Sequence, residues 1–171
     1  MQATKDTFFR TLQSRLAAVN PARTITVDGV VRPAIVVAEN EAFPPPKLFF
    51  QTFYIHWLAA PAVRGFRRTL APRYELTAQV EYFAQGTATL KRPFADRGRV
   101  MAQMDRELLL ILFPGYTEKK DHSVSPAVSL GSTLHWTWAP DFRTVADAEG
   151  SVLRRLATVN VSFFEETIPN P

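Results

Sequence analysis

The chain has 171 residues, of which 46% are hydrophobic and 21% are charged, and these values are typical of one globular domain with a buried core. Its lack of cysteine excludes disulfides, thiolate metal sites and a cysteine nucleophile, and the absence of any run of about 18 apolar residues argues against a membrane span. The net charge of +4 is compatible with an acidic partner surface, although many proteins that bind no nucleic acid share it.

The first predicted element is an amphipathic helix over residues 4–19. Its apolar side chains recur at three- and four-residue spacing and are Phe9, Leu12, Leu16 and Val19, with Phe8 beside them. Arg10, Gln13, Ser14 and Arg15 are expected to face solvent mostly. The helix ends at Asn20-Pro21, because a residue that precedes proline disfavours the helical conformation. The first residues lack the apolar core of a signal peptide, so we expect the chain to fold in the cytosol.

A β-hairpin is predicted next, centred on Asp28-Gly29. This dipeptide is the strongest short hairpin signal in the chain. A β-branched run over residues 24–27 precedes it, and the return strand is expected over 30–38. Pro33 lies inside that strand and indicates a sheet edge or a bulge.

A long strand rich in aromatic residues is predicted over residues 47–58. One face carries Phe49, Phe53, Ile55 and Trp57, and the other carries Phe50, Thr52, Tyr54 and His56. A two-layer fold needs only one such face. Two explanations stay open: a core that spans both sides because two helices pack there, or a second face that another subunit buries.

Residues 59–73 are predicted to form a long loop that carries several arginines around one aromatic ring. The residues are Arg64, Phe66, Arg67, Arg68 and Arg73. Arginines next to a ring suit phosphate contacts and base stacking in a nucleic-acid interface. The same side chains suit acidic residues on a protein partner, or simple solvation of a loop, and all three interpretations remain open.

The clearest predicted strand, residues 73–83, leads to the longest predicted helix, residues 96–113, which begins with Asp96 as the N-cap. The strand alternates apolar and polar residues, which favours an antiparallel sheet with one wet face. The helix has one apolar stripe, formed by Val100, Met101, Met104, Leu108, Ile111 and Leu112, and Arg99, Gln103, Arg106 and Glu107 fall largely outside it. The last turn, residues 108–113, is apolar on all sides, so we expect cover from the sheet and from a second side or a neighbouring subunit.

Residues 115–132 are predicted to form a second long irregular stretch, and further strands are expected over 133–138 and 151–165. The predicted order is α-β-β-β-β-α-β-β, which describes an α+β fold with two helices packed on an antiparallel sheet. No repeat or boundary divides the chain, so residues 1–171 are interpreted as a single domain with long loops at 59–73 and 115–132.

No group of residues matches a catalytic, metal-binding or nucleotide-binding pattern. The histidines His56, His122 and His135 lie far apart, and no Asp or Glu stands at ligand spacing from them. The chain contains no GxSxG elbow, no P-loop and no GxGxxG. We therefore predict no cofactor, no metal and no enzymatic activity. A small hydrolase is the least favoured alternative, since it would need a pocket with convergent polar groups.

The order and size of these elements resemble the tail terminator proteins of long-tailed bacteriophages and of related tail-like particles. In that family an N-terminal helix precedes an antiparallel sheet, a second helix crosses the sheet, and a final strand pair follows. The matching features are the helix 4–19, the Asp28-Gly29 hairpin, the strand 74–83 leading to the helix 96–113, and the closing strand 157–164. The arginine loop and the stretch 115–132 have no counterpart in this pattern.

The resemblance implies a structural role: a homo-oligomeric ring, usually six-fold, that caps the tail tube, stops its growth and faces the neck connector. The implied partners are copies of the chain, the tail tube protein and the neck or connector protein, and the implied location is the virion after assembly in the host cytoplasm. Phe50, Tyr54 and His56 would form the subunit contact, and residues 64–73 would touch tube or neck. A nucleic-acid-binding module that uses the arginine loop is the main alternative.

Overall fold

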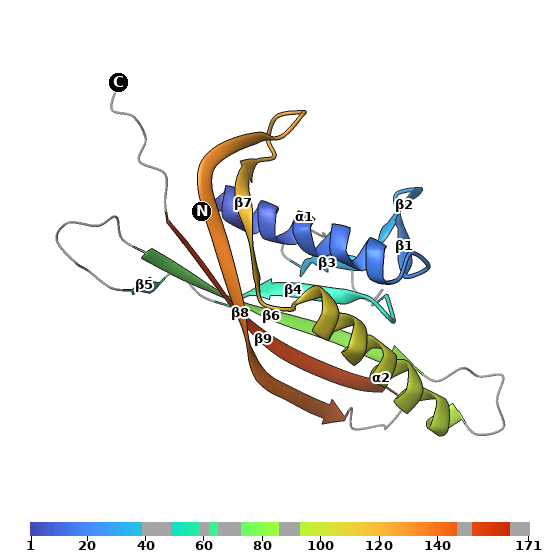
Figure 1. Ribbon diagram of the computed structural model, residues 1–171. Helices are drawn as coiled ribbons and strands as arrows, with labels where there is room; N and C mark the ends of the chain where they lie inside the picture. The colour runs from blue at the N-terminus through green and yellow to red at the C-terminus, as the bar shows by residue number, and fades with distance from the viewer. Residues whose placement is uncertain (39–48, 59–61, 65–72, 86–92, 147–151, 165–171) are drawn as a thin grey trace.

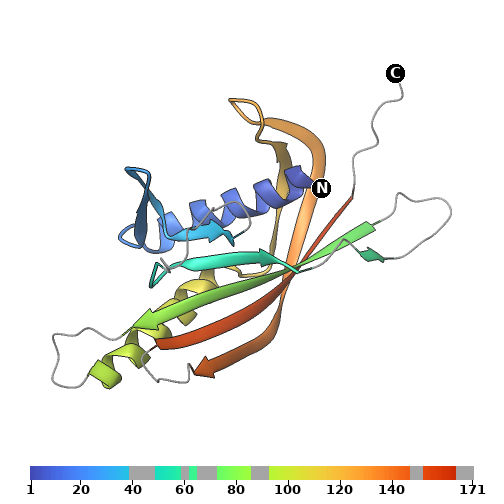
Figure 2. The same ribbon diagram turned by 180° about the vertical axis from the view of Figure 1, so that it is seen from behind.

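The computed structural model describes residues 1–38, 49–58, 62–64, 73–85, 93–146 and 152–164, which form an α+β arrangement as expected (Figure 1). In chain order the elements are α1 (Gln2–Val19), β1 (Thr24–Val27), β2 (Val30–Pro33), β3 (Ile35–Val37), β4 (Phe53–Trp57), β5 (Ala62–Arg64), β6 (Arg73–Gln85), α2 (Pro93–Ile111), β7 (Gly115–Asp121), β8 (Val128–Ala146) and β9 (Val152–Phe164). Both helices lie on the same face of the large sheet, as the view from behind also shows (Figure 2). Neither described helix is long and apolar enough to cross a membrane.

The large sheet has the strand order β3-β4-β6-β9-β8-β7, and β5 pairs with the first residues of β6. The described strand pairs are antiparallel except for β3 and β4, which run parallel, so the prediction of a purely antiparallel sheet is wrong at this edge. A parallel pair needs a long connection between its strands, and residues 38–52 supply it. The strands β6 and β9 pair over their whole length, from Arg73 opposite Phe164 to Gln85 opposite Val152.

The predicted hairpin is confirmed. Asp28 and Gly29 join β1 to β2 with φ values of 51° and 78°, and positive φ at both central residues is typical of the turn that Asp-Gly favours. The return strand does not run unbroken over 30–38. It is interrupted at Ala34, so that β2 belongs to a separate two-stranded sheet and β3 to the large sheet. Pro33 ends β2, in agreement with an edge position for a residue that lacks an N–H.

The stretch 115–132, predicted to be irregular, is largely strand, because β7 and the start of β8 occupy most of it. β7 is an edge strand, and edge strands carry charged side chains that hide the apolar alternation by which a strand is recognised. The β7–β8 register shifts between Glu118 and Lys120, and Gly131 has a φ of 69°, a left-handed value found in β-bulges. The predicted loop 59–73 likewise contains β5 and ends at the first residue of β6.

Helix α1 covers part of the free edge of β7. The hydroxyl of Thr7 accepts a hydrogen bond from the N–H of Lys120 at 3.0 Å and donates one to the Lys120 carbonyl at 3.1 Å. Thr7 itself is only 3% exposed. One hydroxyl thus satisfies both backbone groups that an additional strand would otherwise bind, which protects this edge against pairing with another chain.

Replacing Thr7 with valine is expected to lower the free energy of unfolding by about 1–3 kcal/mol, because Lys120 loses the partner of its N–H and C=O while the side-chain shape is kept. Thr11→Val is the matched control: the Thr11 hydroxyl donates only to the Thr7 carbonyl of its own helix, at 2.8 Å, so a change within about 0.5 kcal/mol is expected. Urea unfolding measures both. Equal losses in the two variants would contradict the role assigned to Thr7.

The main core lies between the two helices and the sheet. Its fully buried side chains include Phe8, Leu12 and Leu16 from α1, Met104, Leu108 and Ile111 from α2, and Leu76, Val80, Trp136, Val159 and Phe163 from the strands. The predicted stripe of α2 is buried apart from Val100, which is partly exposed. In α1 the stripe is shifted, since Phe8 is fully buried, Phe9 is only partly buried and Val19 is 39% exposed.

Arg15 links this core to the C-terminal end of α2. Its guanidinium lies 4.7 Å from the ring centroid of Trp136 and donates to the carbonyls of Ile111 and Phe113, at 3.0 and 2.9 Å. The last carbonyls of a helix lack partners within it, so a cation there is favourable. Gly115 gives the room, because a Cβ at this position would lie 2.9 Å from Nη2 of Arg15. Arg15 is therefore a cap for α2, whereas it was expected to face solvent mostly.

The opposite face of the sheet carries a second, smaller core beneath the β1–β2 hairpin. It consists of Ile25, Ala34, Val36, Tyr54 and Phe83. β4 is therefore buried on both faces, as its alternating residues face the helices on one side and this core on the other. Helices packed on opposite faces of the sheet do not explain this burial of β4, because α1 and α2 pack on the same face. Further along β6, the alternation of buried and partly exposed residues confirms the predicted wet face.

Candidate functional site

The arginine cluster predicted at 64–73 is described only at its two ends. Arg64 closes β5 and lies opposite Arg73, the first residue of β6. The guanidinium of Arg73 donates to the hydroxyl of Ser162 on β9, at 2.9 Å. Phe66, Arg67 and Arg68 lie outside the described residues. The structure thus brings the backbones of Arg64 and Arg73 together and uses one of the two side chains in a contact within the sheet.

The predicted subunit contact of Phe50, Tyr54 and His56 does not form a continuous exposed surface. Tyr54 is 4% exposed, and its hydroxyl donates to the Phe49 carbonyl and accepts from the Phe49 N–H. Phe50 precedes β4 and is 38% exposed. His56 is partly exposed and bonds to Glu81. The chain's own hairpin core covers Tyr54, which leaves Phe50 and part of His56 accessible.

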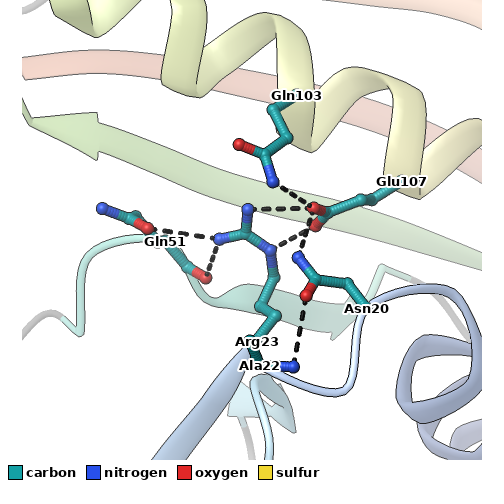
Figure 3. A network of polar contacts seen from close by, with 6 residues as sticks. All are labelled: Asn20, Ala22, Arg23, Gln51, Gln103 and Glu107. Carbon is teal, nitrogen blue, oxygen red and sulfur yellow. Dashed lines mark hydrogen bonds and ion pairs between the residues drawn. The ribbon is translucent and has the colours of Figure 1, made fainter.

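A buried polar network joins the turn before β1 to α2 (Figure 3). Arg23 and Glu107 form an ion pair through two contacts, Nε with Oε2 and Nη2 with Oε1, the latter at 3.1 Å, and each side chain is 6% exposed. The amides of Asn20 and Gln103 donate to Oε1 of Glu107 at 2.7 and 3.1 Å. One guanidinium and two amides therefore compensate a carboxylate that α2 carries into the interior.

The network also holds the turn that precedes β4. Nη1 of Arg23 donates to the backbone carbonyl of Gln51 at 3.2 Å, and the N–H of Gln51 donates to the Phe83 carbonyl at 2.9 Å. Gln51 has a φ of 62°, a left-handed value that costs on the order of 1–2 kcal/mol for a residue with a Cβ. A cavity of about 330 Å³ opens beside the network and is lined by Asn20, Ala22, Arg23, Thr24, Phe50, Gln51 and Gln103.

This cavity is poorly equipped for catalysis. Its lining offers amides, one hydroxyl and one aromatic ring, but no histidine or carboxylate to act as a general acid or base. The guanidinium of Arg23 is engaged by Glu107 and Gln51. Among the described residues, no group of three or more histidines and carboxylates is placed to hold a metal ion. The network links α1, β1, the turn before β4 and α2.

This polar network was not predicted from the sequence. Glu107 falls largely outside the predicted apolar stripe of its helix, yet the whole residue is 5% exposed. Arg23 stands in a turn with no recognisable motif. The two residues are far apart in the sequence, so no local pattern indicates that they meet; the one available hint is a carboxylate one residue before the fully apolar last turn of a helix.

A second attachment of α2 runs through Asp105. The hydroxyl of Tyr82 on β6 donates to Oδ1 of Asp105 at 2.6 Å, and Arg155 on β9 pairs with Oδ2 at 3.2 Å. Burial, followed by the hydrogen bond to Asp105, raises the pKa of Tyr82 far above its ordinary value. The phenol therefore stays protonated as a structural donor, which makes it unsuitable as a base at neutral pH.

Glu81 connects three strands on the sheet face opposite the helices. Its carboxylate lies 3.0 Å from Nε2 of His56 on β4 and forms an ion pair with Nε of Arg154 on β9. Burial raises the pKa of Glu81, but the hydrogen bond from His56 and the charge and hydrogen bond of Arg154 outweigh it and hold the pKa below its ordinary value. Glu81 is therefore ionised at neutral pH and stabilises this part of the sheet.

The depressed pKa of Glu81 predicts a pH dependence of stability. Its ionised form stabilises the fold above the unfolded-state pKa, which is about 4.3, and this contribution is lost as the pH falls through the lower folded-state pKa. Glu81→Gln should therefore be less stable than the unmodified chain near neutral pH and lose less stability below about pH 4. Urea unfolding across this range tests it, with exposed Asp28→Asn as control. Identical pH slopes for Glu81→Gln and the unmodified chain would contradict the prediction.

Several large apolar side chains are exposed to solvent in the described part of the chain. The most exposed are Val30 (63%), Val31 (65%), Leu58 (52%), Leu110 (50%), Phe113 (70%), Tyr116 (72%) and Val128 (56%). The last turn of α2 was expected to be covered on more than one side. The described protomer covers the side that faces the sheet and leaves Leu109, Leu110 and Phe113 exposed.

Comparison of the chain with models of known protein families and with curated proteins finds no match. The polar clusters described above join elements of the fold to one another and contain no reactive constellation. Among the described residues, the exposed apolar side chains have no role inside the protomer.

Proposed function

We propose that this chain is a structural assembly protein, a tail terminator whose copies form a ring that caps the tail tube of a bacteriophage-like particle and joins it to the neck. The order of its elements supports the proposal: an N-terminal helix, a hairpin, the long strand β6 leading into α2, and the closing strand β9. One observation carries it: the described part of the protomer has a buried core and still exposes large apolar side chains, among them Leu110 and Phe113.

Exposed apolar side chains that gather on one element mark contact sites with other proteins, since a monomer gains nothing by leaving them in water. In a ring each protomer covers part of its neighbour, so the mechanism is assembly and not chemistry. The proposed partners are copies of the chain, the tail tube protein and the neck protein, and the proposed location is the virion. In this proposal the arginine loop, whose described ends Arg64 and Arg73 lie opposite each other in the β5–β6 pair, contacts tube or neck.

This function is tested by electron microscopy of the chain mixed with tail tubes of the same bacteriophage-like particle. The proposal predicts closed rings seated on one end of each tube. The nucleic-acid alternative predicts retention on double-stranded DNA that falls steeply between low and moderate salt, because phosphate contacts release counterions. Tubes without rings, together with such salt-dependent retention, would contradict the proposal and favour the alternative.

A further inference from the structure

An exposed stripe runs along the outer side of α2. The helix stripe consists of Arg99, Arg106, Leu109 and Leu110, which recur at helical spacing on α2, together with Phe113, two residues beyond the end of the helix; all five are exposed. Its first half is basic, and its last turn is apolar, with Phe113 70% exposed. In Figure 1 α2 lies in front of the sheet, with no helix or strand over its outer side. Neither arginine forms a hydrogen bond or ion pair with another described residue.

The β1–β2 hairpin presents a second uncovered surface. The hairpin tip consists of Asp28, Gly29, Val30 and Val31, and the two valines are 63% and 65% exposed. Successive strand residues point to opposite sides, so both sides of the ribbon are apolar and uncovered here. Asp28 is exposed and forms no ion pair with a described residue. The hairpin projects from the body of the protomer near the C-terminal end of α1 in both views.

The two surfaces are both partly apolar, and they complement each other in charge. The hairpin tip is a narrow projection with two β-branched side chains and one carboxylate. The helix stripe offers apolar side chains at the C-terminal end of α2 and just beyond it, with the guanidinium of Arg106 about one turn before Leu110. Opposite charges at the rim of an apolar contact set the orientation and the partner more than the affinity. The hairpin tip therefore supplies a negative charge and the helix stripe a positive charge, each beside apolar side chains.

We infer that the hairpin tip of one copy docks on the helix stripe of the next copy, with the side of the ribbon that carries Val31 against Leu110 and Phe113, and Asp28 facing Arg106. This inference rests on the proposed ring and names its contact. The two surfaces belong to different elements of one protomer, so the contact is head-to-tail, and such contacts close into rings when the rotation between neighbours allows it.

Two variants separate the halves of the contact. Val31→Glu disables the hairpin tip and keeps the helix stripe, whereas Phe113→Glu does the reverse. Sedimentation velocity at about 100 µM should show the unmodified chain as a species larger than a dimer, because association depends on concentration, and each variant alone as a monomer. An equimolar mixture of the two variants should contain a dimer and nothing larger, since one intact contact remains. A monomeric unmodified chain, an oligomeric variant or a monomeric mixture would each overturn the inference.

Charge and position controls complete the experiment. Arg106→Glu should weaken association by about tenfold or more, because it faces Asp28, and the added Asp28→Asn substitution should restore part of the loss while keeping a residue suited to the turn. Phe50→Glu alters an exposed aromatic residue outside both surfaces and should keep the mass of the unmodified chain. Thermal unfolding verifies that each variant folds. Loss of association in Phe50→Glu but not in Phe113→Glu would move the contact elsewhere and overturn the inference.

The tube assay distinguishes a wrong contact from a wrong function. If Phe113→Glu still forms rings on tail tubes, the hairpin–helix contact is wrong and the terminator function stands. If the unmodified chain forms no ring on the tubes, the proposed function is wrong, whatever the chain does in solution.

Discussion

Replacing Arg23 with methionine is expected to lower the free energy of unfolding by about 3–5 kcal/mol, a large share of the stability of a domain of this size. Methionine fills a similar volume but leaves the carboxylate of Glu107 inside the protein without its cation. The turn at Gln51 also loses a donor that holds its left-handed backbone. Urea unfolding followed by far-UV circular dichroism measures the loss.

Two controls show whether the charge or the packing of Arg23 matters. Arg106→Met changes an exposed arginine next to Glu107 and should alter stability by no more than about 0.5 kcal/mol. The double variant Arg23→Met, Glu107→Leu removes both charges and should regain most of the loss, because a buried ion pair replaced by apolar side chains of similar volume is often neutral. A double variant as unstable as Arg23→Met alone would show that the stranded carboxylate is not the cause.

Trp136→Ala is expected to cost about 3–5 kcal/mol, the range for removing a large aromatic side chain from a core. The ring is 1% exposed, lies 5.8 Å from the ring of Phe8 in an edge-to-face arrangement, and stacks under the guanidinium of Arg15. Its Nε1 also donates to the carbonyl of Phe113 at 3.2 Å, so the cap of α2 is weakened together with the core.

Tyr116→Ala provides the comparison for Trp136→Ala. Tyr116 lies on the neighbouring strand β7 and is 72% exposed, so its removal should change stability by about 0.5 kcal/mol or less in the monomer. Circular dichroism is the suitable signal because it does not depend on the tryptophan that is removed. A loss below about 1.5 kcal/mol in Trp136→Ala would show that the core closes over the cavity more easily than its packing indicates.

Sequence periodicity predicted the elements whose burial repeats locally. Both helices, the Asp28-Gly29 hairpin and the strand β6 lie close to the expected positions, because each shows one buried face at its own period. The start of α2 was placed at Asp96, whereas the helix begins at Pro93 and Asp96 lies in its first turn. Proline suits the first helical position, and an acidic residue is favourable throughout that turn, so the two signals compete for one boundary.

The failures share a different cause, which is pairing between distant segments. β7 was read as irregular because its charged residues conceal the strand, yet Lys119 within it is fully buried, with Nζ donating to the Phe164 carbonyl at 2.8 Å. The ion pair of Arg23 and Glu107 and the parallel pairing of β3 with β4 likewise depend on which segments meet in space. Composition and residue spacing do not indicate which distant segments pair.

In the proposed ring, neighbouring copies of the chain cover the apolar side chains that one protomer leaves exposed to water. Hydroxyl-radical footprinting measures this cover residue by residue. As the concentration rises from about 1 to about 100 µM, oxidation of Phe113 and Val31 should fall while that of exposed Phe50 stays constant, because association buries only the two docking surfaces. Equal oxidation of Phe113 at both concentrations would contradict the proposed association between copies.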